Sequence, residues 1–229
     1  MIVSDALKKR KSVRAFLDRP VPPPILIKIL EQAKRAPSGD NHQPWEVAIL
    51  TGEAKNSLSV KLEEAFRSGE QPTMDYEYYP QNKKSEKDTE WKGKFKERRM
   101  NCGVALYTQL GITRTMQKEK EDLYALNYRG FNAPVVLLFF IDKELGKGSY
   151  IDYGMFLQSV MLLATENGLA TCSQGSLGEY ADIIRNELPE YKDKIVLCGM
   201  SLGYEDPSKP INGYRTARQE ITEMVKYYD

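Results

Sequence analysis

The chain has 229 residues, which is long enough for one domain of ordinary upper size, or two small ones, with a large core. Its 33 basic and 32 acidic side chains give a net charge of +1, which favours neither nucleic acid nor an anionic membrane as a partner. The longest apolar run, 134–141, is far shorter than a membrane span, and no segment has the pattern of a signal peptide. Three cysteines and the single His42 show neither metal-ligand spacing nor a disulfide framework. We therefore expect a cytoplasmic, reducing location and no metal site.

Hydrophobic spacing predicts the secondary structure of the N-terminal half. In chain order we expect a helix at 3–9, an extended basic segment at 10–16, a helix at 25–36, a buried strand at 45–51 and an amphipathic helix at 53–67. Pro37 should end the second helix, because the residue before a proline disfavours the helical conformation.

Residues 68–100 then change in character, because they are strongly charged and carry Tyr76, Tyr78, Tyr79 and Trp91. One interpretation is a solvated excursion with partial order. The other is a lid that gates a substrate, because ordered insertions that carry aromatic residues often line binding sites. Composition does not decide between these two interpretations.

The C-terminal half alternates between apolar strands and helices. The predicted helices cover 100–110, with Trp91 as a candidate start of that helix, 118–128, 150–167 and a segment that ends at 188. The predicted strands cover 135–141, 169–172 and 194–202. Helix 150–167 is apolar around most of its circumference, so it should be buried, with a second copy of itself as one candidate partner. Strands and helices mixed in this way indicate an α+β domain, and no G-x-G-x-x-G follows a strand, which argues against a Rossmann fold.

Two stretches near the N-terminus have the character of a binding site. Arg10, Ser12 and Arg14 alternate with other residues, so in an extended backbone two guanidiniums and a hydroxyl converge on one face, where they suit a phosphate. Residues 36–45 form a turn rich in Pro, Ser, Gly and Asn, which leaves backbone amides free to meet a ligand. Taken alone, each stretch is more often ordinary surface or an ordinary turn.

Together, in this order, R-K-S-V-R-A-F and A-P-S-G-D-N-H-Q-P-W resemble the opening of the FMN-dependent nitroreductase family. Stretches 131–134, 152–158, 168–172 and 215–218 agree, and the later ones look most like the nitrobenzoate-reductase branch. The resemblance implies one domain over 1–229 with a mixed sheet flanked by helices. It further implies an intertwined homodimer whose C-terminal tails exchange, with FMN at the interface.

The resemblance also implies which residues contact FMN. Arg10, Lys11, Ser12 and Arg14 match the phosphate end, with Lys11 as a backbone or pyrimidine-side contact. Arg215 and Arg218 are further phosphate candidates, and which of them is the main contact stays open. The loop contributed by the partner subunit matches Pro37, Ser38, Gly39, Asn41 and Gln43.

Three further sets of residues are implied around the flavin ring. Asn127 matches an asparagine that reads the pyrimidine. The amides of Ser173, Gln174, Gly175 and Ser176 match the segment beside flavin N5, although the Glu-Gly pair of many relatives is absent here. Gln158 is either an interface hydrogen-bonder or a contact to the cofactor loop.

The function implied is an FMN-dependent NAD(P)H oxidoreductase that reduces nitroaromatics, quinones or similar acceptors in a ping-pong cycle. The sequence shows no arrangement of nucleophile, base and orienting group, which fits chemistry that belongs to a cofactor. Dehalogenation, enone reduction and flavin cleavage on the same scaffold remain alternatives, as does a non-enzymatic flavin-binding redox sensor.

Overall fold

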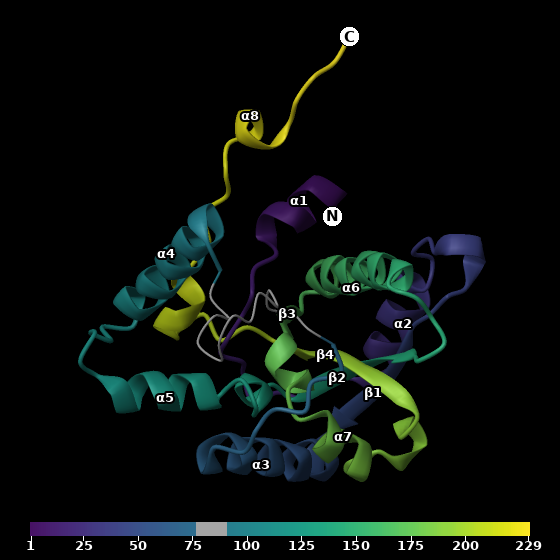
Figure 1. The fold of residues 1–229 in the computed structure, drawn as a ribbon, viewed down its shortest axis with the longest axis horizontal. Coiled ribbons are helices and arrows are strands. Elements are labelled where there is room, and N and C mark those ends of the chain that lie inside the picture. The colour runs from purple at the N-terminus through teal and green to yellow at the C-terminus, as the bar shows by residue number, and fades with distance from the viewer. Residues whose placement is uncertain (77–90) are drawn as a thin grey trace.

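The computed structural model describes residues 1–76 and 91–229, and at its centre lies a four-stranded sheet (Figure 1). The strand order is β1 (Glu46–Thr51), β2 (Val135–Asp142), β4 (Lys194–Gly203) and β3 (Ala170–Gln174). All three neighbouring pairs of these strands run antiparallel. The α+β class is confirmed, and the mixed character expected of the sheet is limited, in the described chain, to one parallel bridge between Ser12 and Thr171.

Strand β2 is the centre of the core, as its continuous apolar sequence predicts, and seven of its eight residues are buried. Its side chains alternate between the two faces of the sheet. Leu137, Phe139 and Ile141 pack into one hydrophobic cluster, and Val136, Leu138 and Phe140 into another. The sheet therefore separates two apolar layers.

Helices cover each layer. The first cluster is closed by α2 (Pro23–Ala33) and α6 (Gly148–Glu166), and the second by α3 (Gly52–Ser68) and α7 (Ala181–Glu187). In Figure 1, α2 and α6 lie above the sheet and α3 and α7 below it. Trp45 stacks on Phe156 of α6 with ring centroids 4.9 Å apart, which fixes the entry into β1.

The remaining helices are α1 (Val3–Lys9), α4 (Gly93–Gln109), α5 (Gln117–Ala125) and α8 (Ile221–Met224). Helices α4 and α5 extend to one side of the sheet, and the tail that carries α8 projects past α1 (Figure 1). Every residue from 215 to 229 is exposed in the single chain, including Tyr227 and Tyr228. In the described part of the chain, no helix is long and apolar enough to cross a membrane.

The predicted elements occur, but several boundaries differ. Helix α2 ends at Ala33, three residues before the expected end, whereas α4 begins at Gly93, close to the candidate start at Trp91. Helix α5 ends at Ala125, three residues before the expected end, and Phe131 and Asn132 further along the chain have positive φ values of 52° and 57°. A 3₁₀ turn at Gly175–Gly178 precedes α7, where a continuous helix was expected.

Gly199 of β4 lets the Gly175–Gly178 turn approach the sheet. A Cβ at Gly199 would lie 2.6 Å from both Cβ and Cδ1 of Leu177. We therefore expect Gly199→Ala to lower the free energy of unfolding by about 1–3 kcal/mol, measured by urea denaturation. Gly146→Ala is the control, since a Cβ there meets nothing within 4 Å. Equal urea midpoints for the two variants would contradict the close approach.

Candidate functional site

The basic segment after α1 docks along the edge strand β3. Ser12 bridges Thr171, and the Val13 amide donates to the Thr171 carbonyl at 3.0 Å. Val13 is buried, whereas Arg10, Ser12 and Arg14 are half-buried. The extended pairing therefore enforces the two-residue alternation that the sequence predicts.

The two ends of the chain meet at one small hollow. Arg10, Ser12 and Arg14 line it from the N-terminal side, and Arg215 and Arg218 from the tail. Its volume is about 210 Å³. The structure thus brings the predicted phosphate-contacting side chains together, although they lie 200 residues apart in the sequence.

The hollow is strongly positive. Partial burial lowers the pKa of Arg10, and the neighbouring charges of Arg218 and Arg215 lower it further. Among the described residues, no carboxylate forms an ion pair with Arg10, Arg14, Arg215 or Arg218. Guanidiniums remain charged at any ordinary pH, so the cluster is electrostatically suited to an anion with several oxygens.

The two tail arginines have different surroundings. Arg215 donates to the carbonyls of Lys8, Lys9 and Arg10, at 3.3 Å for Lys9 and 3.1 Å for Arg10, and so caps the end of α1. Arg218 uses Nη1 within its own segment, on Thr216 and Ala217. Within the described chain its other guanidinium nitrogens make no hydrogen bond, which leaves Arg218 the better placed to meet an anion.

Lys11 differs from its neighbours. Its ammonium lies 2.8 Å from a carboxylate oxygen of Glu205 and also donates to the Asn212 carbonyl. Asn212, which the sequence did not single out, is almost fully buried and is bonded on both sides of its amide. It accepts from the Arg14 amide at 2.9 Å and donates to the Ala15 carbonyl at 2.8 Å. Its place in the turn-rich stretch 206–213 was the one feature of the sequence that could have pointed to Asn212.

At the end of β3, Gln174 has a structural side chain. It is 4% exposed, its Nε2 donates to the Asn127 carbonyl at 2.8 Å, and its Oε1 accepts from the Ser201 hydroxyl. Ser173 and Gly175 on either side are exposed, and a Cβ at Gly175 would meet nothing within 4 Å. The backbone of Ser173–Ser176 is therefore open to a ligand at Ser173 and Gly175, while Gln174 fixes Asn127 beside it.

The loop 37–43 and Gln158 lie elsewhere on the same chain. The Gly39 amide donates to Asp152 of α6 at 3.2 Å, and the Gln43 amide donates to the Ser38 hydroxyl at 3.0 Å. In Figure 1 this loop lies beyond the right-hand end of α6, whereas α1 lies above the left-hand end. Gln158 is half-buried in the middle part of α6. None of these residues lines the arginine hollow of its own chain.

The segment predicted as an insert is anchored at its start. Asp75 accepts from the Val196 amide at 2.7 Å and pairs with Arg185. Tyr76 packs edge-on against Tyr150 at 6.0 Å. Trp91 is 6.1 Å from Phe95, and Tyr78 and Tyr79 lie outside the described residues. The role as a lid stays a prediction.

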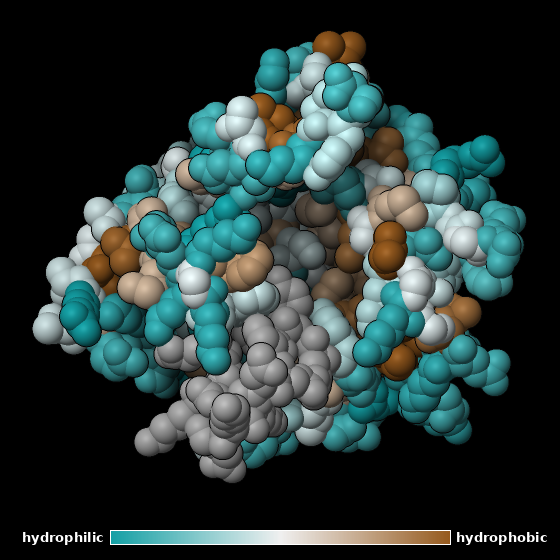
Figure 2. Space-filling model, turned by 45° about the horizontal axis from the view of Figure 1, so that its top comes forward, coloured by the Kyte–Doolittle hydropathy of each residue, from teal (hydrophilic) through white to brown (hydrophobic). Residues whose placement is uncertain are grey.

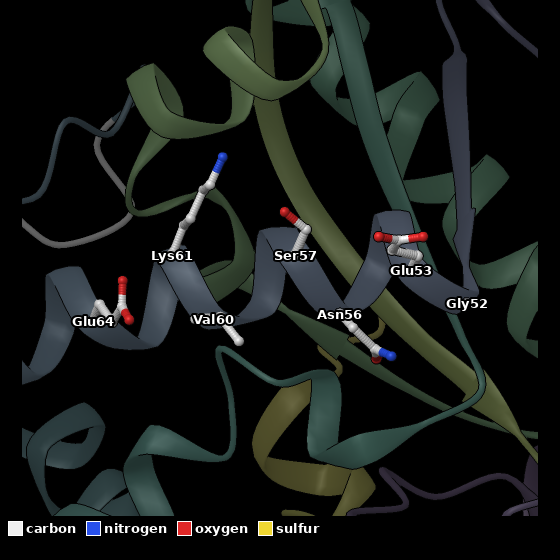
Figure 3. A pocket seen from close by; sticks show the side chains of 7 residues that line it. All are labelled: Gly52, Glu53, Asn56, Ser57, Val60, Lys61 and Glu64. Carbon is white, nitrogen blue, oxygen red and sulfur yellow. The ribbon is translucent and has the colours of Figure 1, made fainter.

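Two other features of the chain lack the character of a binding site. Figure 3 shows an open pocket whose seven lining residues, including Glu53 and Lys61, all belong to α3, and Lys61 is paired with Glu187. One face of one helix offers a ligand few converging groups. In the described ranges 1–76 and 91–229, no three His, Cys, Asp or Glu side chains form a metal-binding group, and the three cysteines are free.

Glu179 carries a carboxylate directly after the Gly175–Gly178 turn. The hydroxyls of Tyr128 and Tyr124 donate to it, the latter at 3.5 Å, and burial raises its pKa in spite of these bonds. The pKa of Glu179 in the folded protein is therefore above its usual value. The protonated carboxyl thus contributes to the free energy of unfolding fully below about pH 4.5, and this contribution is lost as the pH rises through the folded pKa.

We expect Glu179→Gln to remove this dependence, so that the variant gains stability relative to the native chain between pH 4.5 and 7. Urea midpoints of both proteins across this range measure the difference. Glu64→Gln, which removes an exposed carboxylate from α3, is the matched control. Parallel stability curves for Glu179→Gln and the native chain would contradict the assignment.

Comparison with known proteins assigns this architecture. The family model described as "Nitroreductase family" matches residues 7–204. The chain is 36% identical to a 4-nitrobenzoate reductase from Pseudomonas putida over 92% of its length and 88% of the relative. The crystal structure of an FMN and NADPH-dependent nitroreductase, NfnB from Sphigopyxis sp. strain HMH, superposes with a TM-score of 0.92 at 36% identity, covering 100% of both chains.

A second solved structure agrees with the first. The FMN-dependent nitroreductase NfnB from Mycobacterium smegmatis in complex with NADPH gives a TM-score of 0.90 at 31% identity, over 99% of this chain and 98% of the other. The family model spans most of the chain, and the relatives align over almost their whole length, so the chain belongs to the nitroreductase family.

Proposed function

We propose that this protein is an FMN-dependent NAD(P)H oxidoreductase that reduces nitroaromatic compounds and, more broadly, electron-poor acceptors such as quinones. The observation that carries this proposal is the arginine hollow, where Arg10, Arg14 and Arg218 converge without a carboxylate partner in the described chain. The names of the relatives, which include 4-nitrobenzoate reductase and nitrobenzene nitroreductase, support the same chemistry.

The residues present fit FMN at its phosphate end. Arg10, Ser12, Arg14 and Arg218 would hold the phosphate, since forked guanidiniums and a hydroxyl match its oxygens. Arg215 would act indirectly, because its donors are engaged by the end of α1, and it thereby positions Arg10. The ammonium of Lys11 is paired with Glu205, so any contact from this residue to the cofactor would come from its backbone.

The ring would be met by the open end of β3. The exposed backbone at Ser173 and Gly175 offers amides there. The side chain of Asn127 lies beside them, with its Nδ2 donating to the Tyr124 carbonyl at 2.8 Å. Asn127 is held by Gln174, whose amide bridges it to Ser201 in the sheet. Bound FMN supplies a site that accepts a hydride and returns it to an acceptor. The chain's contribution would be to bind and orient the flavin and to polarise its ring.

A second copy of the chain would complete the site. The loop 37–43 and Gln158 lie away from the hollow of their own chain, which fits the role expected for a partner's residues. Ile151 on α6 is 71% exposed and Val3 on α1 is 68% exposed, although both are apolar. Figure 2 shows apolar side chains gathered around a hollow in the middle of this face. Such exposed apolar surface is typical of an interface.

The exposed tail 215–229 would embrace the partner in this homodimer. Tyr227 and Tyr228 are 89% and 88% exposed in the single chain, and tyrosine is a residue type that is enriched at protein interfaces. The reductant and the acceptor would occupy the same open face in turn, which is a ping-pong cycle.

An anaerobic titration tests the reaction class. The purified protein should show flavin absorbance at about 450 nm that disappears on adding NADPH or NADH and returns on adding 4-nitrobenzoate. The same protein without reductant is the control. Flavin that stays oxidised with both nucleotides would overturn the oxidoreductase and favour a sensor, and product analysis would separate nitro reduction from dehalogenation or enone reduction.

The two tail arginines give a sharper test of the phosphate site. Arg218→Ala should weaken FMN binding by about 10- to 100-fold, the value of one or two charge-assisted contacts, with little change in the stability of the apoprotein. Arg215→Ala should instead lower apoprotein stability by about 1–2 kcal/mol, because three carbonyls at the end of α1 lose their donor.

Lys192→Ala is the control for both variants, since it removes an exposed charge that has no ion pair in the described chain. FMN fluorescence quenching and urea unfolding give the two readouts. The assignment would be wrong if Arg215→Ala weakened FMN without altering apoprotein stability while Arg218→Ala had no effect.

A further inference from the structure

A second, larger pocket lies between α4 and α5, and we call it the α4–α5 pocket. Its volume is about 990 Å³, within the range of sites that hold drug-sized ligands. Met100, Val104, Tyr107 and Ile112 form its apolar lining. Met100 is 57% exposed and Val104 63% exposed, so these apolar side chains of α4 have little cover in the single chain.

The rim of the α4–α5 pocket is positively charged. Lys96, Arg99, Arg114 and Lys120 line it, and no acidic residue of the described ranges 1–76 and 91–229 does. The chain as a whole has a net charge of only +1, so this concentration of cations is local. The Lys120 ammonium lies 5.7 Å from the centre of the Tyr107 ring and donates to the Arg114 carbonyl at 2.7 Å. Lys120 thus ties α5 to the loop after α4 and holds its charge beside an aromatic face.

The α4–α5 pocket is separate from the arginine hollow. The tail contacts the other face of α4, where Tyr214 donates to the Cys102 carbonyl at 3.2 Å. Residues 96, 99, 100, 103, 104, 107 and 108 of α4 line the α4–α5 pocket, and residues 98, 101, 102 and 105 line the space beside the tail. These two sets lie on opposite sides of one helix, because 3.6 residues make a turn. A ligand in the α4–α5 pocket would not compete for the hollow of the same chain.

The chemistry of the α4–α5 pocket selects a large, flat, multiply charged anion. Trp91 and Tyr107 offer aromatic faces on which a planar ring can stack, and the four cations suit more than one anionic group. A single-ring carboxylate would use little of the volume and only one or two of the charges. The adenosine 2′-phosphate end of NADPH has a planar base, a 2′-phosphate and a diphosphate, whereas NADH lacks the 2′-phosphate.

We propose that the α4–α5 pocket binds the adenosine 2′-phosphate end of NADPH and gives the enzyme a preference for NADPH over NADH. This assignment rests on the proposed function, because it takes a nicotinamide dinucleotide as the reductant. Arg114 and Lys120 are the residues that would discriminate, since both are basic and both line the pocket from the side of α5.

Direct binding is the first test. Calorimetry on the FMN-loaded protein should show that 2′,5′-ADP binds at least about ten times more tightly than ADP. Arg114→Gln and Lys120→Gln should each weaken 2′,5′-ADP by about tenfold, and Lys120→Arg should retain most of the affinity. Lys118→Gln is the matched control, because Lys118 is an exposed lysine of the same helix that does not line the pocket. Equal affinities for 2′,5′-ADP and ADP, or no loss in either pocket variant, would overturn the proposal.

Steady-state kinetics give the second test. Lys120→Gln should raise KM for NADPH by about tenfold with kcat unchanged, and should leave KM for NADH unchanged. An equal rise for both nucleotides would overturn the assignment to the 2′-phosphate. If benzoate but not 2′,5′-ADP bound in a Lys120-dependent way, the pocket would belong to an aromatic acid instead, and the proposal would be wrong.

The failure of this inference is distinguishable from failure of the proposed function. An enzyme that oxidises NADPH and NADH with the same KM values before and after the pocket substitutions keeps the function and loses the inference. A protein that binds 2′,5′-ADP through Lys120 but never reduces its flavin keeps the pocket and loses the function.

Discussion

Like charges held together set the main constraint on this molecule. Arg10 and Arg14 come from the start of the chain and Arg215 and Arg218 from its end, and the four guanidiniums share one small hollow. Their mutual repulsion opposes the contact between the two segments. Arg215 offsets part of it, because its donors bind the carbonyls at the end of α1, where the helix dipole is negative. A bound anion would relieve the rest of the repulsion, which would couple the stability of the fold to ligand binding at this point.

The sheet edge makes that arrangement possible. Strand β3 pairs with the segment after α1 through Ser12 and Val13, and the buried Val13 side chain fixes which residues face outward. Asn212 then joins the two segments by bonding Arg14 and Ala15. An edge strand that would otherwise expose unpaired backbone groups is covered by the chain's own N-terminal segment, and this segment carries Arg10, Ser12 and Arg14 of the hollow.

Local patterns predicted much of this structure. The continuous apolar run of β2 and the alternation of Arg10, Ser12 and Arg14 are short-range signals, and the structure confirms both because each reflects a fixed backbone period. The turn of 37–43 was predicted from its content of Pro, Ser, Gly and Asn, which is also a local signal. The convergence of the tail on the N-terminal segment was implied only by family resemblance, since no local pattern contains it.

Other features depend on partners distant in the sequence. The sequence could not distinguish Arg215 from Arg218, because the difference lies in the carbonyls of α1 that Arg215 meets after folding. The side chain of Gln174 is hydrogen-bonded to Ser201 and to the backbone of Asn127, and no residue spacing in the sequence predicts these two bonds. The pairing of Lys11 with Glu205 and the buried bonds of Asn212 were missed on the same grounds. The ends of α2 and α5 also differ from the expected ends, because sequence periodicity defines the existence of a helix better than its boundaries.

The loop 37–43 has one further consequence. Asp40, Asn41 and Gln43 all have positive φ values, of 47°, 58° and 49°, although none of them is glycine. Such residues hold unfavourable backbone energy, and here the bonds from Gly39 to Asp152 and from Gln43 to Ser38 keep the loop in place within a single chain. Bonds within the single chain therefore offset the energy of this backbone strain when the chain folds, before it associates with another molecule. A surface that is already held in one conformation loses little conformational entropy on association, so the loop can bind a partner without rearranging its backbone.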